Sequence, residues 1–203
     1  MRRFVAFTLV ACLLPVGAGA QAEAKLAEVE RGVWAASHVG AVYYLELPGE
    51  NPGTAVGSLI GIEVGYDLLR SLQIGVLAWG QSVGAPADYR GITDDAKDPR
   101  GARGDFQSMM LGGGLRWAFL RLPDENGVER THFFVRGGAG VTLSRPVGIL
   151  DERGIFGSGG LGVEYFTQLR HFSVGVELGW LGLFGELGAA HALTLLPHLK
   201  YTF

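Results

Sequence analysis

Cysteine, long apolar runs and excess positive charge are all scarce in this sequence. Cys12 is the only cysteine among 203 residues, so neither a disulfide framework nor a thiolate metal site can form. After residue 20 no apolar run reaches the roughly 20 residues that a membrane-spanning helix needs. The formal net charge is −3, which argues against a nucleic-acid surface because such a surface carries a basic stripe.

Glycine, by contrast, is abundant. The chain has 33 glycines, more than twice the usual share of about 7%. No period of three accompanies them, which excludes collagen. Together with the 48% content of hydrophobic residues, this favours a β-rich protein in which backbone packs closely on one face of a sheet.

The N-terminal segment has the pattern of an export signal. Two arginines precede a short apolar core, and Ala18-Gly19-Ala20 supplies the small residues of a cleavage site. The sequence therefore predicts a signal peptide over residues 1–20, cut between Ala20 and Gln21. A short periplasmic lead-in follows over residues 21–31.

Two alternatives remain open for this segment. Cleavage after Ala22 would shift the mature start by two residues. Lipidation at Cys12 is the other, because Leu9-Val10-Ala11-Cys12 has the spacing of a lipoprotein signal. The apolar stretch continues past Cys12, which disfavours lipidation.

The rest of the chain alternates apolar and polar residues with period two, which is typical of strands with two different faces. In residues 172–181, for example, Val174, Val176 and Leu178 alternate with Gly175 and Glu177. Eight such segments occur, at residues 32–47, 57–68, 72–81, 106–119, 132–143, 156–166, 172–181 and 192–203.

The connections between these segments alternate in length. Those at 69–71, 120–130 and 169–171 are mostly short, and those at 48–53, 84–105, 146–155 and 183–190 are mostly longer. Short periplasmic turns and longer external loops are typical of outer-membrane barrels. The middle turn is long for this pattern, although Asp124-Glu125-Asn126-Gly127 has strong turn chemistry.

Three features favour lipid over water around the apolar face. The polar face consists of glycine and a few charges, which suits the crowded lumen of a narrow barrel. The last segment ends on Phe203. Aromatic residues also gather at the periplasmic end of the apolar face, as in an interfacial girdle; they are Tyr66, Trp117, Phe119, Phe133, Tyr165, Phe172, Tyr201 and Phe203.

The export signal, the eight alternating segments and the terminal Leu199-Lys200-Tyr201-Thr202-Phe203 resemble the small outer-membrane barrels of the OmpA-barrel, OmpX and OmpW type. The resemblance implies an all-β fold over residues 32–203, an eight-stranded antiparallel up-and-down transmembrane β-barrel in the cell outer membrane. It also implies that Tyr201 and Phe203 form the C-terminal assembly signal. The implied partners are outer-membrane lipid, the assembly machinery and other envelope proteins. A fold-level likeness carries little about activity.

Charged residues on the polar faces of the segments cluster near the periplasmic side, and we expect them to form a belt that plugs the lumen. The belt comprises Glu63, Arg116, Arg136, Glu164, Glu177, His198 and Lys200. Hairpin pairing predicts Arg116 opposite Arg136, Arg136 beside Glu164, and Glu164 opposite Glu177. Charges so confined must be paired, because an isolated one carries a large desolvation cost.

Candidate enzymatic and metal sites are weak. His171 and Ser173 have the spacing of the outer-membrane lipid A deacylases, but the Asn-Ala-Gly that follows in that family is replaced by Val174-Gly175-Val176. Asp94, Asp95 and Asp98 are interspersed with basic residues, which favours a solvated loop over a cation site. We therefore expect no catalytic residue, cofactor or metal.

Three functions remain open on the sequence. The first is a structural or interaction barrel that contacts a partner through its external loops, residues 84–105 above all. The second is a narrow channel for small or apolar solutes. The third is a lipid-modifying enzyme.

Overall fold

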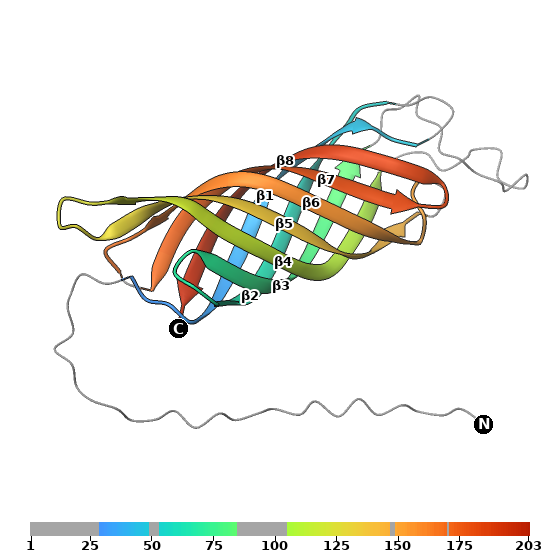
Figure 1. The fold of residues 1–203 in the computed structure, drawn as a ribbon. Coiled ribbons are helices and arrows are strands. Elements are labelled where there is room, and N and C mark those ends of the chain that lie inside the picture. Colours follow the sequence, from blue (N-terminus) through green and yellow to red (C-terminus); the bar gives the residue numbers. More distant parts are fainter. Residues whose placement is uncertain (1–28, 49–52, 85–104, 147–148, 170) are drawn as a thin grey trace, which may run out of the picture.

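The computed structural model describes residues 29–48, 53–84, 105–146, 149–169 and 171–203 (Figure 1). Eight antiparallel strands close into a barrel, each paired with its neighbours in sequence and β8 with β1. They are β1 (Val33–Glu46), β2 (Ala55–Asp67), β3 (Leu72–Gly84), β4 (Phe106–Pro123), β5 (Glu129–Arg145), β6 (Arg153–Phe166), β7 (Phe172–Gly185) and β8 (Gly188–Thr202). Among the described residues, no helix has the length and hydropathy to cross a membrane.

Each predicted strand is present, and the all-β barrel fold is confirmed. We call the end where β1 begins and β8 ends the periplasmic end, as the sequence predicts, and the opposite end the external end. The predicted signal peptide, with its junction at Ala20 and Gln21, and most of the lead-in lie outside the described residues, as does almost all of the 84–105 connection.

The middle turn differs from its prediction. Residues 120–130 were expected to form a long connection, but β4 runs to Pro123 and β5 starts at Glu129. The Asp124 side chain closes the turn by accepting hydrogen bonds from the backbone N–H groups of Asn126 and Val128, at 2.8 and 3.0 Å. Bulges at Ala118/Leu120 and Leu122/Pro123 interrupt the alternation in β4, so period-two counting ends too early. The hairpin projects beyond the periplasmic rim of the barrel (Figure 1).

The prediction of a longer external loop at 183–190 is wrong. Gly185 pairs with Gly188, and only Glu186 and Leu187 lie between the strands. Gly188 has a φ of +131°, a conformation that glycine adopts at little cost. The inward-facing residues before this turn, Leu181 and Leu183, are as apolar as the outward-facing ones, so hydropathy alternation gives no signal there.

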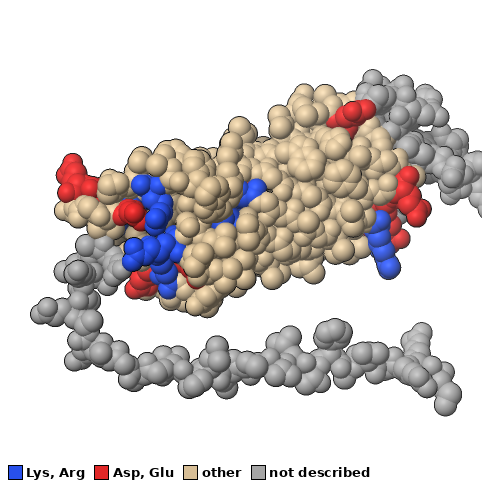
Figure 2. All heavy atoms as spheres, viewed as in Figure 1, with Lys and Arg blue, Asp and Glu red and all other residues tan. Residues whose placement is uncertain are grey.

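The outer surface of the barrel is apolar. Large hydrophobic side chains point outward along every strand; Ile60, Leu161 and Leu178 are each at least 60% exposed. The visible surface between the two ends is almost uncharged (Figure 2). A soluble protein rarely exposes an apolar area of this extent, so the barrel wall is a lipid-facing surface.

Aromatic side chains ring the periplasmic end of this surface, as predicted. Trp117 lies next to Phe119, with ring centroids 6.3 Å apart, and Tyr201 contacts both Phe172 and Phe203, at 4.9 and 5.0 Å. Such rings anchor a barrel at the interface between hydrocarbon and headgroups.

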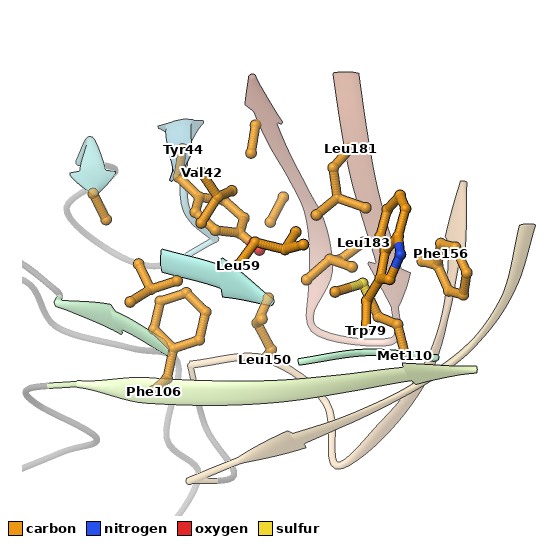
Figure 3. Packing of buried hydrophobic residues seen from close by; sticks show 14 of the residues in the cluster. Val42, Tyr44, Leu59, Trp79, Phe106, Met110, Leu150, Phe156, Leu181 and Leu183 are labelled. Carbon is orange, nitrogen blue, oxygen red and sulfur yellow. The ribbon is translucent and has the colours of Figure 1, made fainter. Parts of the chain in front are cut away.

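The lumen is filled by side chains in two layers. The external layer is mainly apolar and is tightly packed, with side chains from different strands pointing toward one another (Figure 3). A few buried polar side chains lie among them and bind one another, Gln81 with Tyr44 and Ser108 with Ser144. It includes Val42, Leu59, Leu77, Trp79, Phe106, Met110, Phe156, Leu181, Leu183 and Leu196, capped by Ile149 and Leu150. We call this set the apolar layer. The inner face was predicted to consist of glycine and a few charges, and the leucines and large aromatic rings of the apolar layer depart from that prediction.

Two facing glycines make room for one large member of the apolar layer. Gly112 and Gly140 pair across β4 and β5. A Cβ added to Gly112 would lie 2.8 Å from the Phe156 ring, and one added to Gly140 would lie 2.7 Å from it. The Phe156 ring therefore packs directly on bare backbone, which is the close approach that glycine allows.

Candidate functional site

The periplasmic half of the lumen holds the charged layer. All seven residues of the predicted belt lie on inward-facing positions, from β2 (Glu63), β4 (Arg116), β5 (Arg136), β6 (Glu164), β7 (Glu177) and β8 (His198 and Lys200). Arg116 is half-buried and the other six are buried. Three carboxylates face three side-chain cations, so the layer is electrically balanced when its histidines are neutral.

One half of the layer is centred on Arg136. Its Nη2 atom lies 2.8 Å from Glu63 Oε2, and its Nη1 donates to Glu177 Oε2 at 3.3 Å. The guanidinium carbon also lies 4.7 Å from the centre of the Trp79 ring. A single arginine thus links β2, β5 and β7 across the lumen and contacts Trp79 at the periplasmic edge of the apolar layer.

The other half is centred on Glu164, whose side chain is 2% exposed. Its Oε2 lies 2.8 Å from Arg116 Nη2, and its Oε1 lies 2.8 Å from Lys200 Nζ. Ser173 Oγ donates a third bond to Oε1 at 2.5 Å. Arg116 stacks over the Phe134 ring at 3.5 Å. A carboxylate held by two cations and a hydroxyl is the inverse of the arrangement around Arg136.

The predicted hairpin pairings are correct in one case and wrong in two. Arg116 lies opposite Arg136. Arg136, however, pairs with Gly160 rather than lying beside Glu164, which is opposite His132. The β5–β6 hairpin is centred two residues earlier than expected, and each residue of shift in the centre moves a partner by two.

Glu164 likewise pairs with Gly175 rather than with Glu177, because the β6–β7 hairpin is centred one residue earlier than expected. The ion pairs of the layer accordingly connect strands that are not neighbours, by reaching across the lumen. Hairpin register alone does not identify such partners.

Sequence reasoning missed several residues of the charged layer. His38 on β1 places Nε2 at 3.3 Å from Glu63 Oε2, and its ring lies 5.4 Å from that of His198. The His132 ring lies 4.7 Å from Phe166. Both histidines lie on the polar face of their segments, so the alternation that identified Glu63 and Arg136 would also have identified them.

Very little water can enter this layer. A pocket at the periplasmic mouth, between Arg31 and Arg70 on the rim and Arg116 and Glu164 deeper in, has a volume of about 20 Å³. That volume holds about one water molecule. On the external side of this pocket, the apolar layer fills the described part of the lumen.

The structure does not bring the weak enzymatic candidates together. His171 is on the periplasmic rim, where its Nδ1 lies 2.6 Å from Glu30 Oε2 and its ring stacks on Tyr201. Ser173 points into the lumen and binds Glu164. Asp94, Asp95 and Asp98 lie outside the described residues. Among the residues that the structure describes, no group of three or more His, Cys, Asp and Glu side chains could hold a metal ion.

Neither a protein-family model nor a curated protein sequence matches this chain. Solved structures do resemble it. Neisserial surface protein A (NspA) has a TM-score of 0.59 and 13% identity, over 85% of this chain and 97% of that one. OprG of Pseudomonas aeruginosa has a TM-score of 0.48 and 10% identity, over 87% and 98%. The N-terminal β-barrel domain of Pseudomonas aeruginosa OprF has 0.46 and 11%, over 84% and 98%.

The likeness to NspA is one of fold. Together with the closed eight-stranded barrel and its apolar wall, it confirms the type of protein that the sequence resembles, a small barrel of the outer membrane.

Proposed function

We propose that this protein is a non-conducting barrel with a structural or interaction role in the outer membrane, and that it contacts partners through its external loops. The observation that carries the proposal is the filled lumen. A channel needs a continuous polar path, whereas this lumen holds a packed apolar layer on the external side of a closed network of ion pairs.

The apolar layer argues against the narrow-channel alternative. Leu59, Leu77 and Leu181 are fully buried in it, so water does not reach these side chains. An ion that crossed the layer would lose its hydration shell against mainly apolar side chains, at a cost of several kcal/mol or more. The ion pairs of the charged layer close the lumen a second time, on the periplasmic side of the apolar layer.

The external loops are a surface that is available for recognition of protein partners. Residues 84–105 carry five acidic and four basic side chains. Their two ends are fixed by the rigid wall, where Val83 pairs with Phe106. Segments presented from a rigid scaffold commonly carry binding functions, which supports the interaction role.

Conductance across planar bilayers tests the proposal. Purified wild-type protein should leave the membrane current at its baseline. The triple variant Trp79→Ala/Phe156→Ala/Arg136→Ala removes two buried rings from the apolar layer and the central cation of the charged layer. It opens both layers, so it is the positive control and should raise the current. Regular single-channel steps from the wild-type protein would contradict the proposal and favour the channel.

A further inference from the structure

Two arginines at the periplasmic mouth of the lumen form no ion pair with any residue that the structure describes. Arg31 precedes β1, and Arg70 lies in the tight β2–β3 turn that backbone hydrogen bonds between Leu69 and Leu72 close. Both line the mouth of the same pocket. Neither makes a hydrogen bond or an ion pair with another residue of the described chain.

The acids around this pocket have hydrogen-bond or ion-pair partners other than the two arginines, and the charge of Asp67, whose partners are neutral, acts on Arg31 without contact. Asp67 accepts from the backbone N–H of Gly32 through Oδ2, at 3.1 Å, and from Gln73 Nε2 through Oδ1, at 2.6 Å. Glu30 is paired with His171. Glu164 is held by Arg116 and Lys200, as described above.

The positive charge of this rim changes the pKa of Arg31. Partial burial and the nearby guanidiniums of Arg70 and Arg121 lower the pKa of Arg31 below its ordinary value, against the opposing effect of Asp67 and Glu129. Arg121 is neutralised by Glu129 at 2.8 Å. Two guanidiniums that repel each other beside an open pocket form a place where an anion would be stabilised.

We propose that Arg31 and Arg70 bind a phosphate group, that of a phospholipid headgroup in the inner leaflet of the outer membrane. Arginine forms bidentate, charge-assisted hydrogen bonds with phosphate oxygens. The turn that carries Arg70 also bears Leu68 and Leu69, which are 48% and 63% exposed on the lipid-facing side. Those leucines and the adjacent aromatic girdle place Arg70 at the boundary of hydrocarbon and headgroups, where lipid phosphates lie.

Native mass spectrometry of the purified full chain in an uncharged detergent tests this site. The probes are short-chain phosphatidylglycerol, a diacylglycerol of the same chain length that lacks the phosphate, and inorganic phosphate. We expect one phosphatidylglycerol per wild-type barrel and no retained diacylglycerol. Arg31→Gln/Arg70→Gln should lower the retained phosphatidylglycerol about tenfold or more, since each loses charged hydrogen bonds.

The matched control is Arg153→Gln, an exposed arginine at the external end of β6, which should retain the lipid as wild type does. Heat-modifiable migration on gels checks that each variant is folded, and the single Arg70→Gln variant, in an exposed turn, serves if the double variant does not fold. Arginine-dependent binding of inorganic phosphate as well would identify the site as one for free phosphate too; binding of the lipid alone identifies the headgroup. Equal retention of phosphatidylglycerol by wild type and double variant, equal retention of diacylglycerol, or binding of neither phosphate probe would overturn the proposal.

Discussion

Replacing Arg136 with methionine is the most informative test of the charged layer. The side chain is 3% exposed and has two carboxylate partners, and methionine nearly fills its volume without its charge. After the change, Glu177 has no ion pair with any other described residue. Glu63 keeps only His38, at 3.3 Å.

The magnitude follows from this loss of partners. Removing one member of a buried ion pair typically costs about 3–5 kcal/mol, because the other charge stays buried and uncompensated. The stacking of Arg136 on Trp79, at 4.7 Å, adds about 0.5–2 kcal/mol. We therefore expect Arg136→Met to lower the free energy of unfolding by about 3.5–7 kcal/mol.

Second substitutions in this background separate charge from packing. Adding Glu63→Gln and Glu177→Gln removes the stranded charges and should restore most of the lost stability, since an uncharged replacement of a buried ionic group is often neutral. Adding Glu164→Gln should restore nothing, because Glu164 binds Arg116 and Lys200 instead. The two additions form a double-mutant comparison.

The assay is unfolding by urea in lipid vesicles, in which heat-modifiable migration on gels measures the folded fraction. Arg136→Met should also leave bilayer conductance at its baseline, because the apolar layer stays intact. The reasoning is refuted if Arg136→Met is as stable as wild type, or if Glu164→Gln rescues it as well as the pair of Glu→Gln changes does.

Four further predictions concern other parts of the chain. The mature protein should begin at Gln21 and carry no diacylglycerol on Cys12; N-terminal sequencing and intact mass check both. Deleting Phe203, which lies in the aromatic girdle, should reduce assembly and leave protease-sensitive periplasmic material, whereas normal heat-modifiable migration would count against the assembly signal. An epitope tag at Asp95 should be reached by antibody on intact cells, and labelling only after permeabilisation would mean inverted topology. Hydrogen bonds from Arg130 and then from the Val128 backbone hold the pKa of Asp124 below its ordinary value of 3.8, so the stabilisation of the β4–β5 turn is complete above that pH and is lost as pH falls through the lowered pKa; amide exchange at Val128 should accelerate in acid, and in Asp124→Asn at neutral pH.

The strands and their two faces could be predicted because lipid imposes a simple rule. Side chains such as Ile60 and Leu178 must be apolar when they face hydrocarbon, and their period-two spacing survives in almost every strand. Strand ends are harder to predict. The bulge at Ala118/Leu120 reverses the alternation, and near the β7–β8 turn both faces of the strand are apolar, so no alternation is left.

The lumen was less predictable than the wall. Period two placed Glu63 and Arg136 on the inner face but did not identify them as partners, because they lie on β2 and β5 and meet only when the barrel closes. The apolar layer was not predicted, for a different reason. Leucines such as Leu59 and Leu77 face inward, and hydropathy does not distinguish a leucine that faces another side chain from one that faces a lipid.

Because the apolar layer lies on its external side, the charged layer can be reached by water and ions from one end of the barrel only. The packed side chains of the apolar layer separate it from the external medium, while its mouth opens beside Arg70 to the periplasm. Counter-ions therefore approach Arg116 and Glu164 only from the end that carries Arg70. Because Glu164 and Lys200 are buried, salt weakens their ion pair much less than it weakens exposed pairs such as that of Arg145 and Glu152.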